Sequence, residues 1–352
     1  MADSISYLAW RIVQGIGAQA GELIHVLDHA GHNGLLREIT LTVELAGATP
    51  LVELAPPDHL ARLLAAGAPA YFADYDRHRR SWAEQADRVI VLTGGYLDLE
   101  GVPAEAVAQW SAAQDRLTAI EEARRIPSLF VAVPTPAQAA RLGMSFDALE
   151  ALLGDASATP LLELQDGILR ARSRLEEAEE IVIRTGRGHE LRVVRGARPL
   201  LCDDGYIDDE DRACGAVVSN LPAGSVYFTV LEDRTTGSLY LPTASGARDV
   251  VFHFEHGRAA RIEAADGETA LNALFDAHAG EPRRIGHIGI GLNPRLSQPI
   301  GWPLVDEHVR GMLFVAFGEN RYMGGQNASS LNEDFVVPGA VVEVNGRPVI
   351  MP

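Results

Sequence analysis

Residues 21–55, GELIHVLDHAGHNGLLREITLTVELAGATPLVELA, carry the pattern that decides the fold of the first half of the chain. The short apolar segments 21–28 and 49–55 are typical of buried strands, and the residues between them repeat apolar side chains at helical spacing. Two further buried strands are predicted at 86–95 (ADRVIVLTGG) and 126–135 (IPSLFVAVPT), with helical patterns between and after them. Strands that alternate with helices predict an α/β domain with a doubly wound parallel sheet.

The second half has a different pattern. A helical stretch from about 159 to 180 leads into short segments with period-two alternation, such as SVYFTVLED (225–233) and DVVFHFEHG (249–257). Turn residues separate these segments, as expected for antiparallel hairpins. We therefore predict an α/β domain over 1–180, which includes the bridging helix, and a β-rich α+β domain over 181–352.

Composition excludes several classes of function. The net charge of −18 disfavours a nucleic acid or an anionic membrane as the main partner. All 30 basic residues are arginine, which excludes Schiff-base chemistry and a phosphate loop that needs lysine. The N-terminus lacks the features of a signal peptide and no apolar run reaches about 18 residues, so a cytoplasmic protein without a membrane span is expected.

A single imidazole interrupts the apolar segment RRIGHIGIGLNPRL (283–296). Strand alternation places His287 on one face with Ile285, Gly289 and Gly291, while the opposite face is aliphatic and predicts core. Two glycines beside the imidazole predict open space. His287 is therefore either a ligand-binding or metal-binding residue, or a core histidine with a local hydrogen-bond partner.

A second polar segment lies near the C-terminus, in GENRYMGGQNASSLNEDFVV (318–337). Asn332 and Asp334 are two residues apart, so in an extended strand both point to the same face. If their strand neighbours that of His287, the three side chains form one polar cluster.

Three motifs of the second half resemble those of the thermophilic aminopeptidase (aminopeptidase T) family. They are SNLPAGSVYFTVLED (219–233), IGHIGIGLNP (285–294) and GENRYMGG with SSLNEDFVV (318–337). The chain is also similar, and more closely, to the 2,5-dihydroxypyridine dioxygenases that share this fold. The resemblance implies an aminopeptidase T-like fold with a cleft in the C-terminal domain.

The resemblance also implies which positions would hold metals, and several are changed here. In the peptidases, a metal-binding glutamate occupies the position of Ser225, a second that of His287, and a histidine that of Phe314. The late His-x-Asp pair becomes Asn332 and Asp334. A two-metal site needs several anionic oxygens, so metallopeptidase activity is the least expected function.

The resemblance to the dioxygenases implies that more of the metal ligands are retained than in the comparison with the peptidases. His287 and Asp334 match two of the three ligands that hold Fe(II) in that family, and Asn332 stands at the third. An amide oxygen is a poorer ligand for ferrous iron than imidazole. His308 or Glu232 could supply a substitute third ligand.

Two hypotheses follow. In the first, the chain is a pseudoenzyme that binds a peptide or small molecule in the ancestral cleft through His287, Asn332, Asp334, Tyr322 and Ser225. It would need no cofactor and could present its ligand to a partner enzyme. In the second, it is a mononuclear non-haem Fe(II) dioxygenase, or another metal-dependent enzyme, with an altered triad. Resemblance to both families also implies a homo-oligomer, a dimer or larger.

Overall fold

The computed structural model describes residues 2–55, 57–67, 69–94, 97, 99 and 101–350. The chain forms two compact units, the first from residues 1–158 and 205–222 and the second from residues 159–204 and 223–352. Among the described residues, no helix is both long and apolar enough to cross a membrane.

The first unit is built on one five-stranded parallel sheet in the order β2-β1-β3-β4-β8. Its strands are β1 (Leu23–Asp28), β2 (Thr49–Leu54), β3 (Arg88–Thr93), β4 (Ser128–Ala132) and β8 (Val218–Leu221). The strands predicted at 21–28, 49–55, 86–95 and 126–135 are confirmed. The sheet grows outward from β1 in both directions, as in doubly wound folds.

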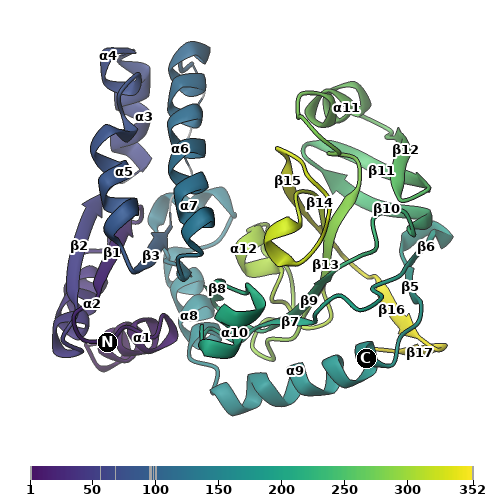
Figure 1. Cartoon of the computed structure of the whole chain (residues 1–352), viewed down its shortest axis with the longest axis horizontal. Coiled ribbons are helices and arrows are strands. Elements are labelled where there is room, and N and C mark those ends of the chain that lie inside the picture. The colour runs from purple at the N-terminus through teal and green to yellow at the C-terminus, as the bar shows by residue number, and fades with distance from the viewer. Residues whose placement is uncertain are drawn as a thin grey trace. The chain divides into compact units, whose positions relative to one another are not determined.

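Helices of the first unit form two packed groups. One joins α1 and α2 with α8, and the other joins α6 with α3, α4 and α5. The helices are α1 (Ala2–Gly15), α2 (Asn33–Leu45), α3 (Pro57–Ala65), α4 (Pro69–Phe72), α5 (Asp76–Gln85), α6 (Ala104–Arg124), α7 (Pro136–Arg141), α8 (Phe146–Ser157) and α10 (Asp209–Cys214). Figure 1 draws these helices in colours that run from purple to teal.

The second unit contains two antiparallel sheets. One has seven strands in the order β12-β11-β10-β6-β5-β16-β17, and the other has five in the order β15-β14-β13-β9-β7. The strands are β5 (Ile181–Arg184), β6 (Glu190–Val193), β7 (Leu201–Asp203), β9 (Ser225–Thr229), β10 (Thr236–Ala244), β11 (Ala247–Glu255), β12 (Arg258–Glu263), β13 (Ile285–Gly291), β14 (Leu313–Gly318), β15 (Asn332–Val337), β16 (Val341–Val344) and β17 (Arg347–Pro348). The predicted β-rich second half is thus confirmed.

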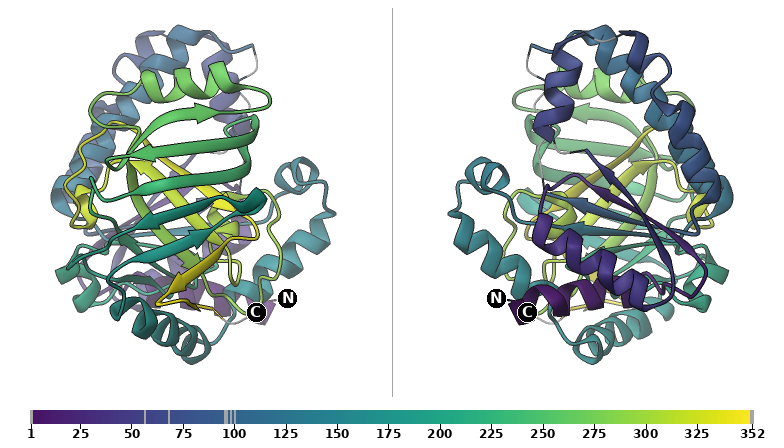
Figure 2. Two further views of the ribbon diagram at one scale, coloured as in Figure 1. Left: turned by 90° about the vertical axis from the view of Figure 1, so that its right-hand side faces the viewer. Right: turned by 90° about the vertical axis from the view of Figure 1, so that its left-hand side faces the viewer.

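Helices of the second unit are few and flank the sheets. They are α9 (Leu161–Glu176), α11 (Glu268–Asp276), α12 (Pro303–Asp306) and the short 3₁₀ turns η1 (Gly186–Gly188) and η2 (Arg321–Met323). The left view of Figure 2 shows the green strands β10–β12 side by side, with α11 packed along them.

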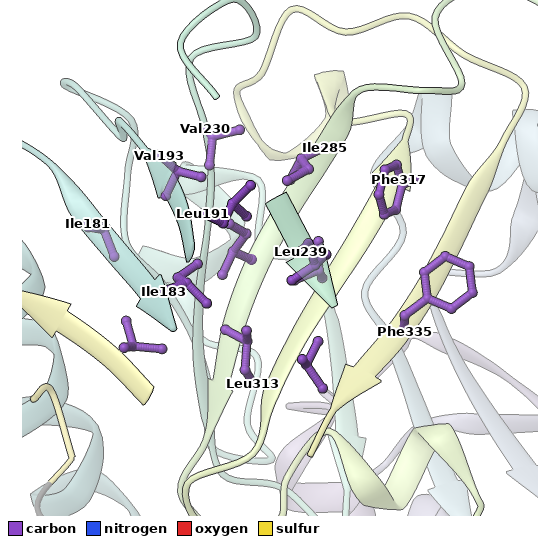
Figure 3. Packing of buried hydrophobic residues seen from close by; sticks show 14 of the residues in the cluster. Ile181, Ile183, Leu191, Val193, Val230, Leu239, Ile285, Leu313, Phe317 and Phe335 are labelled. Carbon is purple, nitrogen blue, oxygen red and sulfur yellow. The ribbon is translucent and has the colours of Figure 1, made fainter. Parts of the chain in front are cut away.

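One apolar core holds the two sheets of the second unit together. Ile183 and Leu239 of the seven-stranded sheet and Leu313 and Phe317 of the five-stranded sheet are fully buried in the same cluster (Figure 3). Alternation explains this core, because each strand sends every second side chain between the sheets.

The division of the chain differs from the predicted boundary near 180 in two places. Helix α9 belongs to the second unit, because Ile168, Ala171 and Leu175 on its apolar face are buried in that unit's core. Residues 205–222 return to the first unit, where β8 pairs with β4.

Candidate functional site

Three neighbouring strands bring His287 and Asp334 together. In the five-stranded sheet, His287 of β13 lies opposite Ala316 of β14, which lies opposite Asp334 of β15. The methyl group of Ala316 leaves room above the middle strand, so the two longer side chains meet across it. His287 Nε2 lies 3.2 Å from Asp334 Oδ1, and the side chains are 9% and 30% exposed. The two groups are within ion-pair distance, but Asp334 Oδ1 is buried without a hydrogen-bond partner among the described residues, so the contact is not a well-aligned hydrogen bond.

The third predicted member of the cluster turns elsewhere. Asn332 lies opposite Gly318 at the start of β15 and is exposed. Its Nδ2 donates a hydrogen bond to the hydroxyl oxygen of Tyr322, which is 3.3 Å away on η2. The structure therefore contains two contacting pairs, His287–Asp334 and Asn332–Tyr322, on neighbouring parts of the same strand.

The glycines beside His287 do not leave open space, contrary to the prediction. The ring of Phe314 covers Gly289, so that a Cβ at that glycine would lie 2.0 Å from Phe314 Cζ. A Cβ at Gly291 would lie 2.2 Å from the carbonyl oxygen of Val309. Glycine fits at both positions because the Phe314 ring at Gly289 and the Val309 backbone at Gly291 come too close for a side chain. His287 lies between aromatic rings, 6.0 Å from that of Phe314 and 6.1 Å from that of Tyr227.

The face predicted for Ile285 is also wrong. A register shift between Ile285 and His287 inserts an extra residue into β13 relative to β14. Such a bulge turns the preceding side chain to the other face. Ile285 is therefore buried in the core (Figure 3). Ile288 and Ile290 belong to the same buried cluster.

The remaining predicted residues have partners of their own. Ser225 lies opposite Gly291, whereas His287 lies opposite Thr229, so Ser225 is four positions along the pairing from the imidazole. The carboxylate of Glu232 accepts hydrogen bonds from Arg198 Nη2 at 2.8 and 3.0 Å.

His308, the other proposed substitute ligand, is almost fully buried. Its Nε2 lies 3.6 Å from Asp203 Oδ2, and burial lowers the pKa of the imidazole although the Asp203 carboxylate opposes this shift. No hydrogen bond or ion pair joins Ser225, Glu232 or His308 to His287 or Asp334 in the part of the chain that the structure describes.

One acidic residue near the pair was missed by the sequence analysis. Glu307 directly follows α12, which packs against β15 (Figure 1). Burial, and then the charges of Asp334, Asp203 and Asp306, raise the pKa of Glu307 well above its ordinary value. The run Asp306-Glu307-His308 offers two carboxylates beside His308, and this signal in the sequence could have identified Glu307.

Asp306 has a structural role. Its two carboxylate oxygens accept hydrogen bonds from the backbone N–H groups of Ile300 and Gly301 at 2.7 and 2.8 Å. Burial raises its pKa in spite of these donors. Asp306 thereby fixes the loop before α12 and, with it, the position of Glu307.

These residues do not fit the metal centres that the resemblance implies. Within the described ranges, no three histidine, cysteine or acidic side chains converge in a way that could hold a metal ion. His287 Nδ1 is buried without a hydrogen-bond partner among the described residues, whereas a metal-bound histidine normally donates its second N–H to an acceptor. A two-metal site would need more anionic donors than His287 and Asp334 supply. The ferrous triad fails as well, because Asn332 faces Tyr322.

Comparisons with known proteins agree on the fold. The structure is similar to wild-type AmpT from Thermus thermophilus, with 20% identity, a TM-score of 0.74 and 99% of each chain covered. It is also similar to 2,5-dihydroxypyridine dioxygenase from Pseudomonas putida KT2440, with 16% identity, a TM-score of 0.64 and 100% and 96% of the two chains covered. No curated protein matches the sequence. The model of the thermophilic metalloprotease (M29) family matches residues 5–347. The chain therefore belongs to the thermophilic metalloprotease (M29) family.

Proposed function

We propose that this family member binds a peptide or a small polar molecule at the His287–Asp334 pair without a metal centre, as a pseudoenzyme. The observation that carries the proposal is the ring of Phe314 above Gly289. An apolar ring occupies the flank of His287 on which a metal with its water or substrate would need room. The imidazole instead contacts the carboxylate of Asp334.

The groups around the pair indicate what the ligand offers. Asp334 is 30% exposed and can accept hydrogen bonds from a ligand. Asn332 is exposed and Tyr322 half-buried on the same side of β15, and amide and phenol groups both donate and accept. The acidic Glu307 beside Asp334 favours a positively charged group. A short peptide with a free amino group meets these requirements.

Binding and metal analysis test this proposal together. Protein purified without chelator is analysed for metals by mass spectrometry, and tetra-alanine with a free amino terminus is titrated by calorimetry. We expect no stoichiometric metal and a saturable heat that Asp334→Asn weakens about tenfold or more. Glu333→Gln is the matched control, because this neighbour alternates to the other face and its carboxylate accepts from Ser245. Stoichiometric metal together with metal-dependent release of alanine would contradict the proposal.

A mononuclear metal enzyme is the second candidate, and the position of Glu307 favours it. Asp334 contacts His287. Burial and then the charge of Asp334 raise the pKa of Glu307, so an added cation would relieve part of that repulsion, although these side chains do not converge as a ligand set in the described residues. Imidazole and carboxylate are donor types that ferrous iron accepts. Anaerobic loading with Fe(II), followed by oxygen uptake on hydroxylated pyridines, is the measurement. Uptake that His287→Ala abolishes would favour this candidate over the first.

A further inference from the structure

The first unit contains a cavity of about 350 Å³ that is separate from the His287–Asp334 pair. Its walls come from α1, the start of α2, the residues after β4 and one face of α8. The floor is apolar and consists of Ile5, Leu8, Leu35, Val133 and Leu153. This volume lies in the range of small-molecule sites, which are concave and mostly apolar with a few polar groups.

The cavity lies where doubly wound sheets bind ligands. Val133 and Pro134 follow the carboxyl end of β4, and His32 lies in the connection from the carboxyl end of β1 to α2. The sheet order reverses between β1 and β3, and ligands of such sheets bind outside the carboxyl ends of strands near that reversal. The cavity therefore has both the shape and the position of a binding site.

Close contacts hold the loops beside the cavity in place. After β3, a Cβ at Gly94 would lie 2.4 Å from the carbonyl oxygen of Val133 and 2.9 Å from the Cβ of Ala30. The three loops that follow β1, β3 and β4 therefore meet without spare room. A wall fixed in this way is preformed, which lowers the entropy cost of binding.

Apart from His32, the described side chains that line the cavity and can carry a charge near neutral pH are carboxylates. Asp147 and Glu150 line it from α8, and both are exposed. Among the described residues that line it, none is an arginine. His32 Nδ1 accepts a hydrogen bond from the N–H of Leu35 at 3.1 Å, so this nitrogen is already committed. We propose that the cavity binds a small organic cation, a primary amine whose apolar body fills the floor and whose ammonium group lies near Asp147 and Glu150.

Three probes of similar size and different charge test the proposal on the full chain. They are 2-phenylethylamine, 2-phenylethanol and 3-phenylpropionate, each titrated by calorimetry to about 10 mM, a concentration at which a millimolar site becomes saturated. We expect one site for the amine, about tenfold or more weaker binding of the alcohol, and no binding of the acid. Because the carboxylates are exposed, affinity for the amine should fall as salt rises.

Two variants place the amine in this cavity. Gly154 lines it, and a Cβ there would meet no atom within 4 Å. Gly154→Leu should therefore fill the cavity without strain, since leucine also favours the helix, and abolish binding. The double change Asp147→Asn, Glu150→Gln should weaken the amine about tenfold or more and leave the alcohol unchanged. Asp155→Asn, an exposed change on the same helix outside the cavity, is the matched control.

The outcomes separate this site from the one in the second unit. Amine binding that persists in His287→Ala and disappears in Gly154→Leu supports the proposal. Equal binding of amine and acid, binding that survives Gly154→Leu, or no saturable binding of any probe overturns it. None of these results depends on the function proposed for His287 and Asp334.

Discussion

The contact between Phe314 and Gly289 makes a prediction that a double-mutant cycle can test. A methyl group at Gly289 would lie 2.0 Å from Phe314 Cζ and 2.5 Å from Cε1 and Cε2. Ordinary contacts between carbon atoms are about 3.5–4.0 Å long. The ring would therefore have to move by more than about 1 Å to restore an ordinary distance to the new methyl group. Phe314 is only 3% exposed, so the displaced ring would have to push against buried neighbours.

The magnitudes follow from this geometry. Overpacking of a well-filled core costs about 1–3 kcal/mol, and we expect Gly289→Ala to reach the upper end. Phe314→Leu removes ring atoms and should cost about 1–2 kcal/mol by itself. In the double variant the smaller leucine makes room for the methyl group. The combined loss should therefore be smaller than the sum of the two single losses by about 1.5 kcal/mol or more.

Hydrogen exchange is the suitable assay, because a chain with two compact units need not unfold in one step. Exchange of the β13 and β14 amides, followed by mass spectrometry of peptides from 285–318, reports the local free energy of opening. Peptides from β3 in the first unit serve as the internal control. Additive losses within about 0.5 kcal/mol would refute the reasoning. They would mean that the glycines do border open space, and the proposal of a metal-free site would lose its main support.

Three further predictions concern charge and metal. Because the pKa of Glu307 is raised above its ordinary value of 4.5, the wild type loses stability as pH rises through and above that value, so Glu307→Gln should raise the melting temperature more at pH 8 than at pH 4. A hydrogen bond from Arg116 lowers the pKa of Asp76 from 3.8 to about 2. Asp76→Asn should therefore lower the free energy of unfolding by about 1–2 kcal/mol at pH 7, a value discounted because Arg116 is 46% exposed. In denaturant titrations, this loss of stability should shrink below pH 3.8 and vanish near the folded pKa of Asp76. Asn332→His adds an imidazole at a position that faces Tyr322, so this variant should not gain saturable Fe(II) binding in anaerobic titrations; saturable binding that appears only in the variant would show that position 332 lies within reach of a ferrous ligand set.

Much of the fold could be predicted from local pattern. The strands of the parallel sheet other than β8 are short apolar segments with helical patterns between them, and local periodicity identifies such elements. β8 could not be predicted as a strand of this sheet. Its sequence, VSNL, is half polar with Val218 exposed, and its partner β4 lies some 90 residues earlier in the chain. Local sequence patterns cannot indicate that β8 pairs with a strand so far away in the sequence.

The candidate site could be predicted only in part. The sequence suggested that His287 and Asp334 meet if their strands are neighbours. The strands are separated by β14, and the two side chains come into contact across it. Whether glycine means an opening or a close approach depends on which side chain fills the space. The identity of Phe314 was visible in the sequence, but its position above Gly289 was not. The bulge that turns Ile285 into the core has no clear sequence signature either. The homo-oligomer and the partner enzyme stay predictions.

The return of residues 205–222 to the first unit has a consequence for synthesis on the ribosome. The parallel sheet lacks its last strand until position 221 has left the exit tunnel, and by then all of α9 and β5–β7 have emerged. Until that moment β4 is an unprotected sheet edge, to which a strand from another nascent chain could add. A fragment cut at residue 158 or 180 keeps this edge permanently, so it should aggregate where the uninterrupted polypeptide does not.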